Sequence, residues 1–263
     1  MANESTLFSD SAAYERFMGS WTRAVGAKFL DWIAAADGQR LLEVGCGTGI
    51  FTEMLVKATA PREIIAIDPA PTQIELAKGK PFARDVDFRI ADAQALPFAN
   101  GDFDLAVSAL VINFIPDQAR AMAEMRRVVK PAGLVAGYVW DFTGDLNVAR
   151  HIQIPLRKLN PNLPKVIGAD SSRLEPLINL FAGAGFENVT GCPIEAEVTY
   201  PSFDAYWRGF IENPSAQSAY IKALPSSEFE RFRDTVRSTM PIKADGTITF
   251  SARAHAVKGF VSR

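Results

Sequence analysis

Short apolar runs alternate with helical patterns through residues 38–140. An apolar run at residues 41–44 predicts a buried strand that leads into a Gly-rich turn. Residues 50–58 predict a helix, because their apolar side chains recur at the i, i+3, i+4 and i+7 positions of one helical face. Nearly continuous apolar strands that alternate with helices are typical of a parallel sheet covered on both faces, so we expect an α/β fold. The remaining strands are predicted at residues 63–67, 86–90, 103–109 and 134–140, and the remaining helices at residues 70–79 and 117–130.

The regular alternation ends after residue 140. Residues 141–170 and 201–240 follow no single period, although helical spacing is visible at 205–211 and 228–240. A helix at 172–183, a strand from residue 186 and a late, half-exposed strand at 248–257 are predicted from the remaining pattern. The second half therefore extends the layered fold and interrupts it twice.

The Gly-rich turn LLEVGCGTG at residues 41–49 is the most informative stretch. Gly45, Gly47 and Gly49 follow the first predicted strand and precede a helix. Without a Cβ atom the chain turns tightly and a ligand can approach the main chain, and free N–H groups at a helix start can face an anion. A dinucleotide fingerprint, G-x-G-x-x-G, would need a glycine where Ile50 stands. The spacing thus counts against a nicotinamide-dependent oxidoreductase, which stays the alternative together with a non-catalytic binding protein.

Several features accompany this turn in a fixed order. The spacing G-x-G-x-G after Glu43 resembles motif I of class I S-adenosylmethionine-dependent methyltransferases. Residues 66–70 (AIDPA) resemble the second motif of that family, and residues 128–134 (VVKPAGL) match its turn before the fifth strand. Residues 95–104 resemble the type 11 methyltransferases, which include those of ubiquinone and menaquinone biosynthesis. The resemblance implies a Rossmann-like sheet of seven mostly parallel strands, with helices on both faces, an antiparallel last strand and helical insertions that form a cover.

This organisation is that of a single methyltransferase domain over residues 1–263. We expect an N-terminal helical segment at 1–37 and a cofactor-binding core at 38–140. Insertions at 141–170 and 201–240 would cover the substrate, and residues 172–200 and 247–260 would complete the sheet.

The resemblance also implies a cofactor and a reaction. A methyl group would pass from S-adenosylmethionine to an O, N or C atom of a small-molecule acceptor by in-line displacement, leaving S-adenosylhomocysteine. Glu43 would serve the ammonium group of the cofactor, Asp68 both ribose hydroxyls, and Asp92 the adenine amino group. The predicted cofactor site comprises Glu43, Gly45, Cys46, Gly47, Gly49, Asp68, Pro69, Asp92, Ala93 and Leu110.

The N-terminal segment YERFMGSW at residues 14–21 is similar to a stretch that precedes the sheet in many type 11 proteins. There it folds over the methionine end of the cofactor, where an aromatic ring attracts a sulfonium. Tyr14, Met18 and Trp21 are therefore added to the cofactor site. The alternative is an amphipathic helix that packs Tyr14, Phe17 and Trp21 on the sheet.

Candidate substrate residues follow from the rule that open α/β sheets bind ligands beyond the carboxyl ends of their strands. Phe114, Trp140 and Trp207 are expected to face the acceptor. No catalytic residue is assigned, because methyl transfer needs positioning first and a general base only for some acceptors. His151 and Asp141 are the candidates for such a base, whereas we interpret His255, in the last predicted strand, as structural.

Charge and cysteine content narrow the partners. The 28 Lys and Arg residues against 30 Asp and Glu residues give a formal charge of −2, which does not favour a nucleic-acid partner. Cys46 and Cys192 match no metal-binding spacing, so no metal is expected. The most apolar run, 105–115, is shorter than the roughly 20 residues of a membrane span, and the first residues lack the pattern of a secretory signal. We expect a cytoplasmic enzyme; the sequence predicts no oligomeric state.

Overall fold

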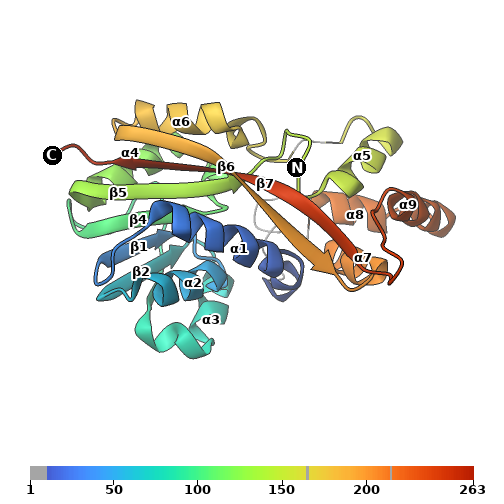
Figure 1. Ribbon diagram of the computed structural model, residues 1–263, viewed down its shortest axis with the longest axis horizontal. Helices are drawn as coiled ribbons and strands as arrows, with labels where there is room; N and C mark the ends of the chain where they lie inside the picture. Colours follow the sequence, from blue (N-terminus) through green and yellow to red (C-terminus); the bar gives the residue numbers. More distant parts are fainter. Residues whose placement is uncertain (1–10, 164–165, 214) are drawn as a thin grey trace.

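A single twisted sheet organises the computed structural model, which describes residues 11–163, 166–213 and 215–263, with side chains from residue 18 onward. In this part of the chain seven strands pair in the order β3-β2-β1-β4-β5-β7-β6 (Figure 1). The strands are β1 (Arg40–Val44), β2 (Glu63–Asp68), β3 (Asp87–Ile90), β4 (Phe103–Ala109), β5 (Val129–Trp140), β6 (Glu187–Tyr200) and β7 (Ile248–Phe260).

The strand directions confirm the predicted fold. Neighbours from β3 to β5 pair in parallel, and β7 runs antiparallel to both β5 and β6. The last strand in sequence is thus the antiparallel one, and it lies between β5 and β6 and not at the edge. The order of the parallel strands reverses between β1 and β4, and ligands bind at such a reversal in open α/β sheets.

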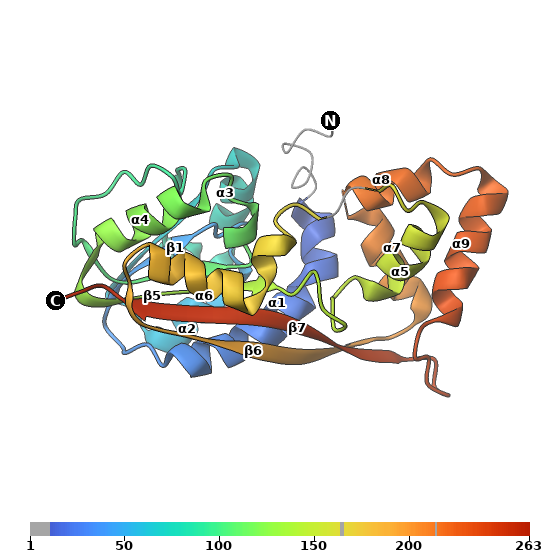
Figure 2. The same cartoon turned by 90° about the horizontal axis from the view of Figure 1, so that it is seen from above.

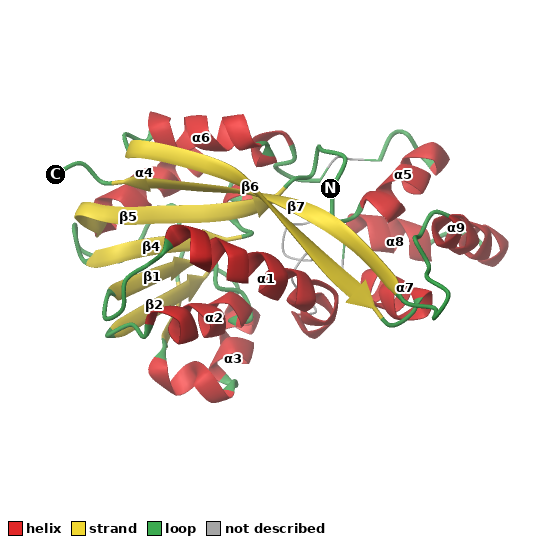
Figure 3. Ribbon diagram, viewed as in Figure 1, coloured by secondary structure: helices red, strands yellow, loops and turns green. Residues whose placement is uncertain are grey.

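Helices cover both faces of the sheet, as the apolar strands predicted. One face packs against α1, α2 and α3, and the other against α4 and α6 (Figures 1 and 3). In β1, Leu41 packs with the first layer, whereas its neighbour Leu42 packs with the second, because successive side chains of a strand point to opposite faces. The helices are α1 (Ser11–Ile33), α2 (Ile50–Thr59), α3 (Pro71–Lys78), α4 (Gln118–Val128) and α6 (Leu174–Gly183).

Helix α1 presents an apolar stripe to the sheet. Trp21, Val25, Phe29 and Ile33 are spaced four residues apart and are buried. The ring of Phe29 lies 4.7 Å from that of Tyr138 on β5, measured between centroids, so the helix is joined to the centre of the sheet.

Four more helices form a lobe beyond the carboxyl ends of the parallel strands. They are α5 (Arg150–Leu159), α7 (Phe203–Glu212), α8 (Ala216–Lys222) and α9 (Ser226–Ser238) (Figures 1 and 2). The long strands β6 and β7 extend past the rest of the sheet and reach this lobe (Figure 2). The sequence pattern had predicted two of these helices, around 205–211 and 228–240, but not α5 or α8.

No helix in the described part of the chain combines the length and the apolar composition that crossing a membrane requires.

Replacement of Phe29 by alanine tests the contact between α1 and the sheet. Phe29 has no exposed surface, so Phe29→Ala should lower the free energy of unfolding by about 3–5 kcal/mol, the usual cost of a large core cavity. Urea denaturation measures this change. Leu76→Ala on α3 is the control, because 46% of Leu76 is exposed. Equal losses in both variants would contradict the assigned core.

Candidate functional site

The Gly-rich turn after β1 is fastened to the neighbouring strand β2. The carbonyl oxygen of Ile67 accepts hydrogen bonds from the backbone nitrogens of Gly45 (2.7 Å) and Cys46 (2.9 Å). The φ angles of Gly45, Gly47 and Gly49 are +80°, +53° and +82°, values that residues with a Cβ atom rarely adopt. The turn therefore depends on glycine at each of these positions for its backbone conformation.

The surroundings of the three glycines differ. A Cβ atom on Gly45 would lie 2.5 Å from the side chain of Val111, and one on Gly49 would lie 3.0 Å from Phe82, so packing excludes larger residues there. A Cβ atom on Gly47 would meet no atom within 4 Å. Gly47 is thus the glycine that leaves open space against the main chain, where a ligand can approach.

Asp68 joins the Gly-rich turn to the end of β2. Its carboxylate accepts hydrogen bonds from the backbone nitrogens of Gly47 (3.0 Å) and Ala70 (2.9 Å). Burial raises the pKa of Asp68, and these two hydrogen bonds offset part of that increase. The same carboxylate that would meet the ribose therefore also orders the loop around the open face of Gly47.

Glu43 on β1 is a buried carboxyl group without a partner. It has no exposed surface, and among the described residues neither of its carboxyl oxygens has a hydrogen-bond partner. Burial raises the pKa of Glu43 to about 7. The charge of Asp68 raises this pKa further, whereas the nearby Thr52 hydroxyl lowers it somewhat, although the Thr52 and Glu43 side chains do not meet the geometry of a hydrogen bond. A buried acid of this kind suits a bound ammonium group, which would restore its charge and its hydrogen bonds.

The next strand end carries Asp92 and Ala93. Asp92 follows β3 by two residues, is exposed, and accepts hydrogen bonds from the backbone and side-chain nitrogens of Gln94 at 2.8 and 3.0 Å. Ala93 is buried beside it, and Pro69 is exposed after β2. These residues lie on the same edge of the sheet as Glu43 and Asp68, because β1, β2 and β3 are parallel.

The end of β4 forms the other wall of this edge. Leu110 has a φ angle of +64°, and its backbone nitrogen donates to the carbonyl oxygen of Tyr138 (2.7 Å). This sharp turn brings Val111 over Gly45. The buried Ser108 hydroxyl donates to the Val44 carbonyl (2.9 Å) and ties β4 to the end of β1. Sequence reasoning missed Ser108 and Thr52, because no motif marks them.

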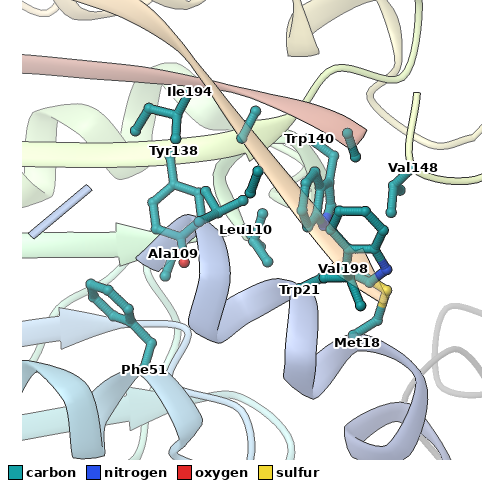
Figure 4. Packing of buried hydrophobic residues seen from close by; sticks show 14 of the residues in the cluster. Met18, Trp21, Phe51, Ala109, Leu110, Tyr138, Trp140, Val148, Ile194 and Val198 are labelled. Atoms are coloured by element: carbon teal, nitrogen blue, oxygen red, sulfur yellow. The ribbon is translucent and has the colours of Figure 1, made fainter. Parts of the chain in front are cut away.

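The N-terminal segment packs into the core. Trp21 has no exposed surface, its indole nitrogen donates to the hydroxyl of Tyr200 (2.8 Å), and its ring meets that of Trp140 edge-on at 5.9 Å. Met18 is buried beside it (Figure 4). This packing favours the amphipathic-helix interpretation for Trp21, and its contact with a cofactor stays a prediction. The side chain of Tyr14 lies outside the described residues.

The predicted substrate-facing residues lie in different places. The Phe114 ring, beyond β4, meets the Phe142 ring, beyond β5, with centroids 6.3 Å apart. Trp140 is 3% exposed at the end of β5. Trp207 packs inside the helical lobe, 5.8 Å from Phe229 on α9. Phe114 thus contacts the residues that follow Trp140 at the end of β5, whereas Trp207 lies in the core of the lobe.

The two candidate bases have unlike surroundings. Asp141 accepts hydrogen bonds from the backbone nitrogens of Thr143 (3.1 Å) and Gly144 (2.7 Å), so its carboxylate stabilises the turn after β5. His151 has a buried Nε2 atom without a partner among the described residues, and burial lowers its pKa to about 4. The imidazole is therefore neutral near pH 7, and the low pKa makes it a weaker base than an exposed histidine. His255 is buried, and its Nδ1 atom bonds to the Ser172 carbonyl (2.8 Å), as a structural residue would.

Within the residues that the structure describes, no group of three or more His, Cys, Asp or Glu side chains could hold a metal ion.

The geometry agrees with a comparison to known families. Residues 42–137 match the family model described as "Methyltransferase domain". The chain carries a methyltransferase domain. The resemblance predicted from the Gly-rich turn and the motifs after it is thereby confirmed, and with it the cofactor class of the domain.

Relatives and solved structures agree with this methyltransferase domain. A ubiquinone/menaquinone biosynthesis C-methyltransferase of Geotalea uraniireducens is 35% identical over 38% of this chain and 45% of its own length. An uncharacterised methyltransferase-like protein of Schizosaccharomyces pombe is 26% identical over 90% of this chain and 87% of its own. A structure of phosphoethanolamine N-methyltransferase 2 of Haemonchus contortus in complex with S-adenosyl-L-methionine shares the fold, with 15% identity, a TM-score of 0.56, and coverage of 96% of this chain and 56% of that one.

The chain spans between 25% and 50% of the length of the first four curated relatives it matches.

Replacement of Glu43 by glutamine tests the buried carboxyl group. In the unfolded chain Glu43 ionises near its ordinary pKa of 4.5, whereas in the folded domain it keeps its proton up to about pH 7. The folded state binds more protons in this window, so wild-type stability should fall by about 3 kcal/mol relative to Glu43→Gln between pH 4.5 and 7. Urea denaturation at several pH values, without cofactor, measures the difference.

The exposed Glu75→Gln variant on α3 is the matched control and should follow the wild-type pH profile. Parallel profiles for wild type and Glu43→Gln would contradict the assignment of a buried, protonated Glu43.

Proposed function

We propose that this protein is an S-adenosylmethionine-dependent methyltransferase that acts on a small molecule. The observations that carry the proposal are the buried carboxyl group of Glu43, which has no hydrogen-bond partner among the described residues, and the open space at Gly47 in the turn after the same strand. The ammonium group of an amino acid would pair with Glu43, and the rest of the amino-acid tail would lie against the main chain at Gly47. The match of residues 42–137 to the methyltransferase domain supports the same ligand.

The residues around this edge suit the parts of the cofactor. Glu43 would hold the ammonium group, Asp68 the ribose hydroxyls, and Asp92 the adenine amino group, with the Ala93 backbone nitrogen beside the ring. Val111 and Leu110 would close the opposite wall. When bound, the cofactor supplies a methyl group activated by a sulfonium. The protein then contributes mainly orientation and the exclusion of water.

The acceptor would approach from the carboxyl ends of β4 and β5. Phe114 and Trp140 lie there, and the lobe of α5, α7, α8 and α9 extends beyond them (Figure 1). We propose that the two insertions and the N-terminal segment form a cover over this edge, within a single domain. The relatives are named as C- and N-methyltransferases, so the methylated atom is not fixed by likeness.

His151 is the better candidate for a general base. Its Nε2 atom is buried and has no partner among the described residues, whereas Oδ1 of Asp141 accepts hydrogen bonds from the turn that follows it. A base is needed only where the acceptor loses a proton during transfer.

The free thiols of Cys46 and Cys192 support a reducing compartment, the cytoplasm.

The methyl-transfer proposal is tested directly with isotopically labelled S-adenosylmethionine and pools of small hydroxylated, amino and carbon-nucleophile acceptors. Mass spectrometry should find S-adenosylhomocysteine together with an acceptor that carries one labelled methyl group. Tight binding of S-adenosylhomocysteine without transfer to any acceptor would instead favour the non-catalytic binding protein.

Replacement of Asp68 by asparagine tests the ribose site. The substitution removes charge-assisted hydrogen bonds, so S-adenosylhomocysteine should bind about 1.5–3 kcal/mol more weakly. Isothermal titration calorimetry measures the affinity. Asp87→Asn is the control, since Asp87 is exposed on neighbouring β3 and pairs with Arg89. If a folded Asp68→Asn variant bound as tightly as the control, the carboxylate would have no part in the site.

A further inference from the structure

A cavity lies beside the predicted acceptor edge. It has a volume of about 340 Å³ and opens between the turn after β5, the helix α5 and the segment that leads into α6. One of its walls is Phe142, whose ring also meets that of Phe114. Phe142 therefore contacts both the cavity and the Phe114 ring, which is predicted to face the acceptor.

Two guanidinium groups line this cavity. Arg157 lies on α5, and Arg173 is the residue that precedes α6. In the described part of the chain neither side chain forms an ion pair; the Arg173 Nε atom makes only a long contact, 3.5 Å, with the carbonyl oxygen of Asp170. Among the described residues that line the cavity, only Asp170 carries a carboxylate. Positive charge thus exceeds negative charge around the cavity.

The orientation of Gln153 adds a further donor. The backbone nitrogen of Ala149 donates to Oδ1 of Asn147 (2.8 Å), so the side-chain nitrogen of Asn147 must be its other end. That nitrogen donates to Oε1 of Gln153 (2.9 Å). The Gln153 side chain therefore presents its NH₂ group as the end left for a ligand. Gln153 and Arg157 are four residues apart, on one face of α5, and both line the cavity.

We propose that this cavity is an anion subsite that receives a carboxylate or phosphate group of the methyl acceptor. Guanidinium groups bind both anions through paired hydrogen bonds, and the amide NH₂ group of Gln153 would add another. Phe114 and Phe142 would contact the apolar part of the acceptor between the anion and the atom that is methylated. The inference rests on the proposed methyl transfer and narrows its substrate class to acidic small molecules.

Binding of simple anions tests the subsite. Wild-type protein saturated with S-adenosylhomocysteine is titrated with succinate and, separately, with inorganic phosphate, at low ionic strength. We expect binding of at least one anion, and the stronger of the two identifies the acidic group. The double variant Arg157→Gln, Arg173→Gln should weaken that binding roughly tenfold or more. Arg208→Gln is the matched control, because Arg208 is exposed on α7 and does not line the cavity.

The acceptor role is tested in the same methyl-transfer screen, which should contain each acid beside its uncharged ester. We expect transfer to acids, with a raised KM and a nearly unchanged kcat in the double variant. Absence of anion binding in wild type, equal binding in the double variant, or transfer to esters with the same KM would overturn the proposal. Affinity for S-adenosylhomocysteine is measured in every variant: its absence in wild type refutes the methyltransferase proposal, whereas normal affinity without anion binding refutes only the subsite.

Discussion

The carbonyl oxygen of Ile67 is the anchor on which the candidate site depends. It accepts two hydrogen bonds from the Gly-rich turn, and the next residue, Asp68, accepts a third from Gly47. These bonds fix the turn against β2 in a conformation that only glycine adopts easily. Because the turn is fixed, α2 begins at Ile50, Val111 packs over Gly45, and Gly47 leaves open space next to the reversal of strand order.

The burial of Glu43 on the central strand β1 lowers the stability of the domain. Among the described residues Glu43 is buried without a hydrogen-bond partner, at a position where an apolar residue would stabilise the domain. Strained or unsatisfied groups of this kind concentrate at ligand sites, where a ligand later provides the missing interactions. The pKa of Glu43 reflects this condition, because burial favours the protonated acid until a positive charge arrives.

The core of the fold was predictable because its signals are local. Continuous apolar strands, the glycine spacing and the acids at strand ends lie within short stretches of sequence, and the structure has them close to the predicted positions. The largest shift in this core is in β5, which begins at Val129 instead of at residue 134. The lobe was less predictable: α5 contains Pro155 inside the helix, and α8 has only seven residues. Contacts across long separations were not predictable at all. Trp21 donates a hydrogen bond to Tyr200, 179 residues away. Arg157 and Arg173 line the same cavity only because of the path that the intervening chain takes.

We propose that the Gly-rich turn and the acids at the ends of β1, β2 and β3 bind an adenosyl amino acid and not a dinucleotide. Calorimetric titration of the wild-type protein with S-adenosylhomocysteine, and in parallel with NAD and NADP, tests it most directly. We expect one-to-one binding of S-adenosylhomocysteine and no heat from either dinucleotide. Tight binding of NAD or NADP, with none of S-adenosylhomocysteine, would contradict it.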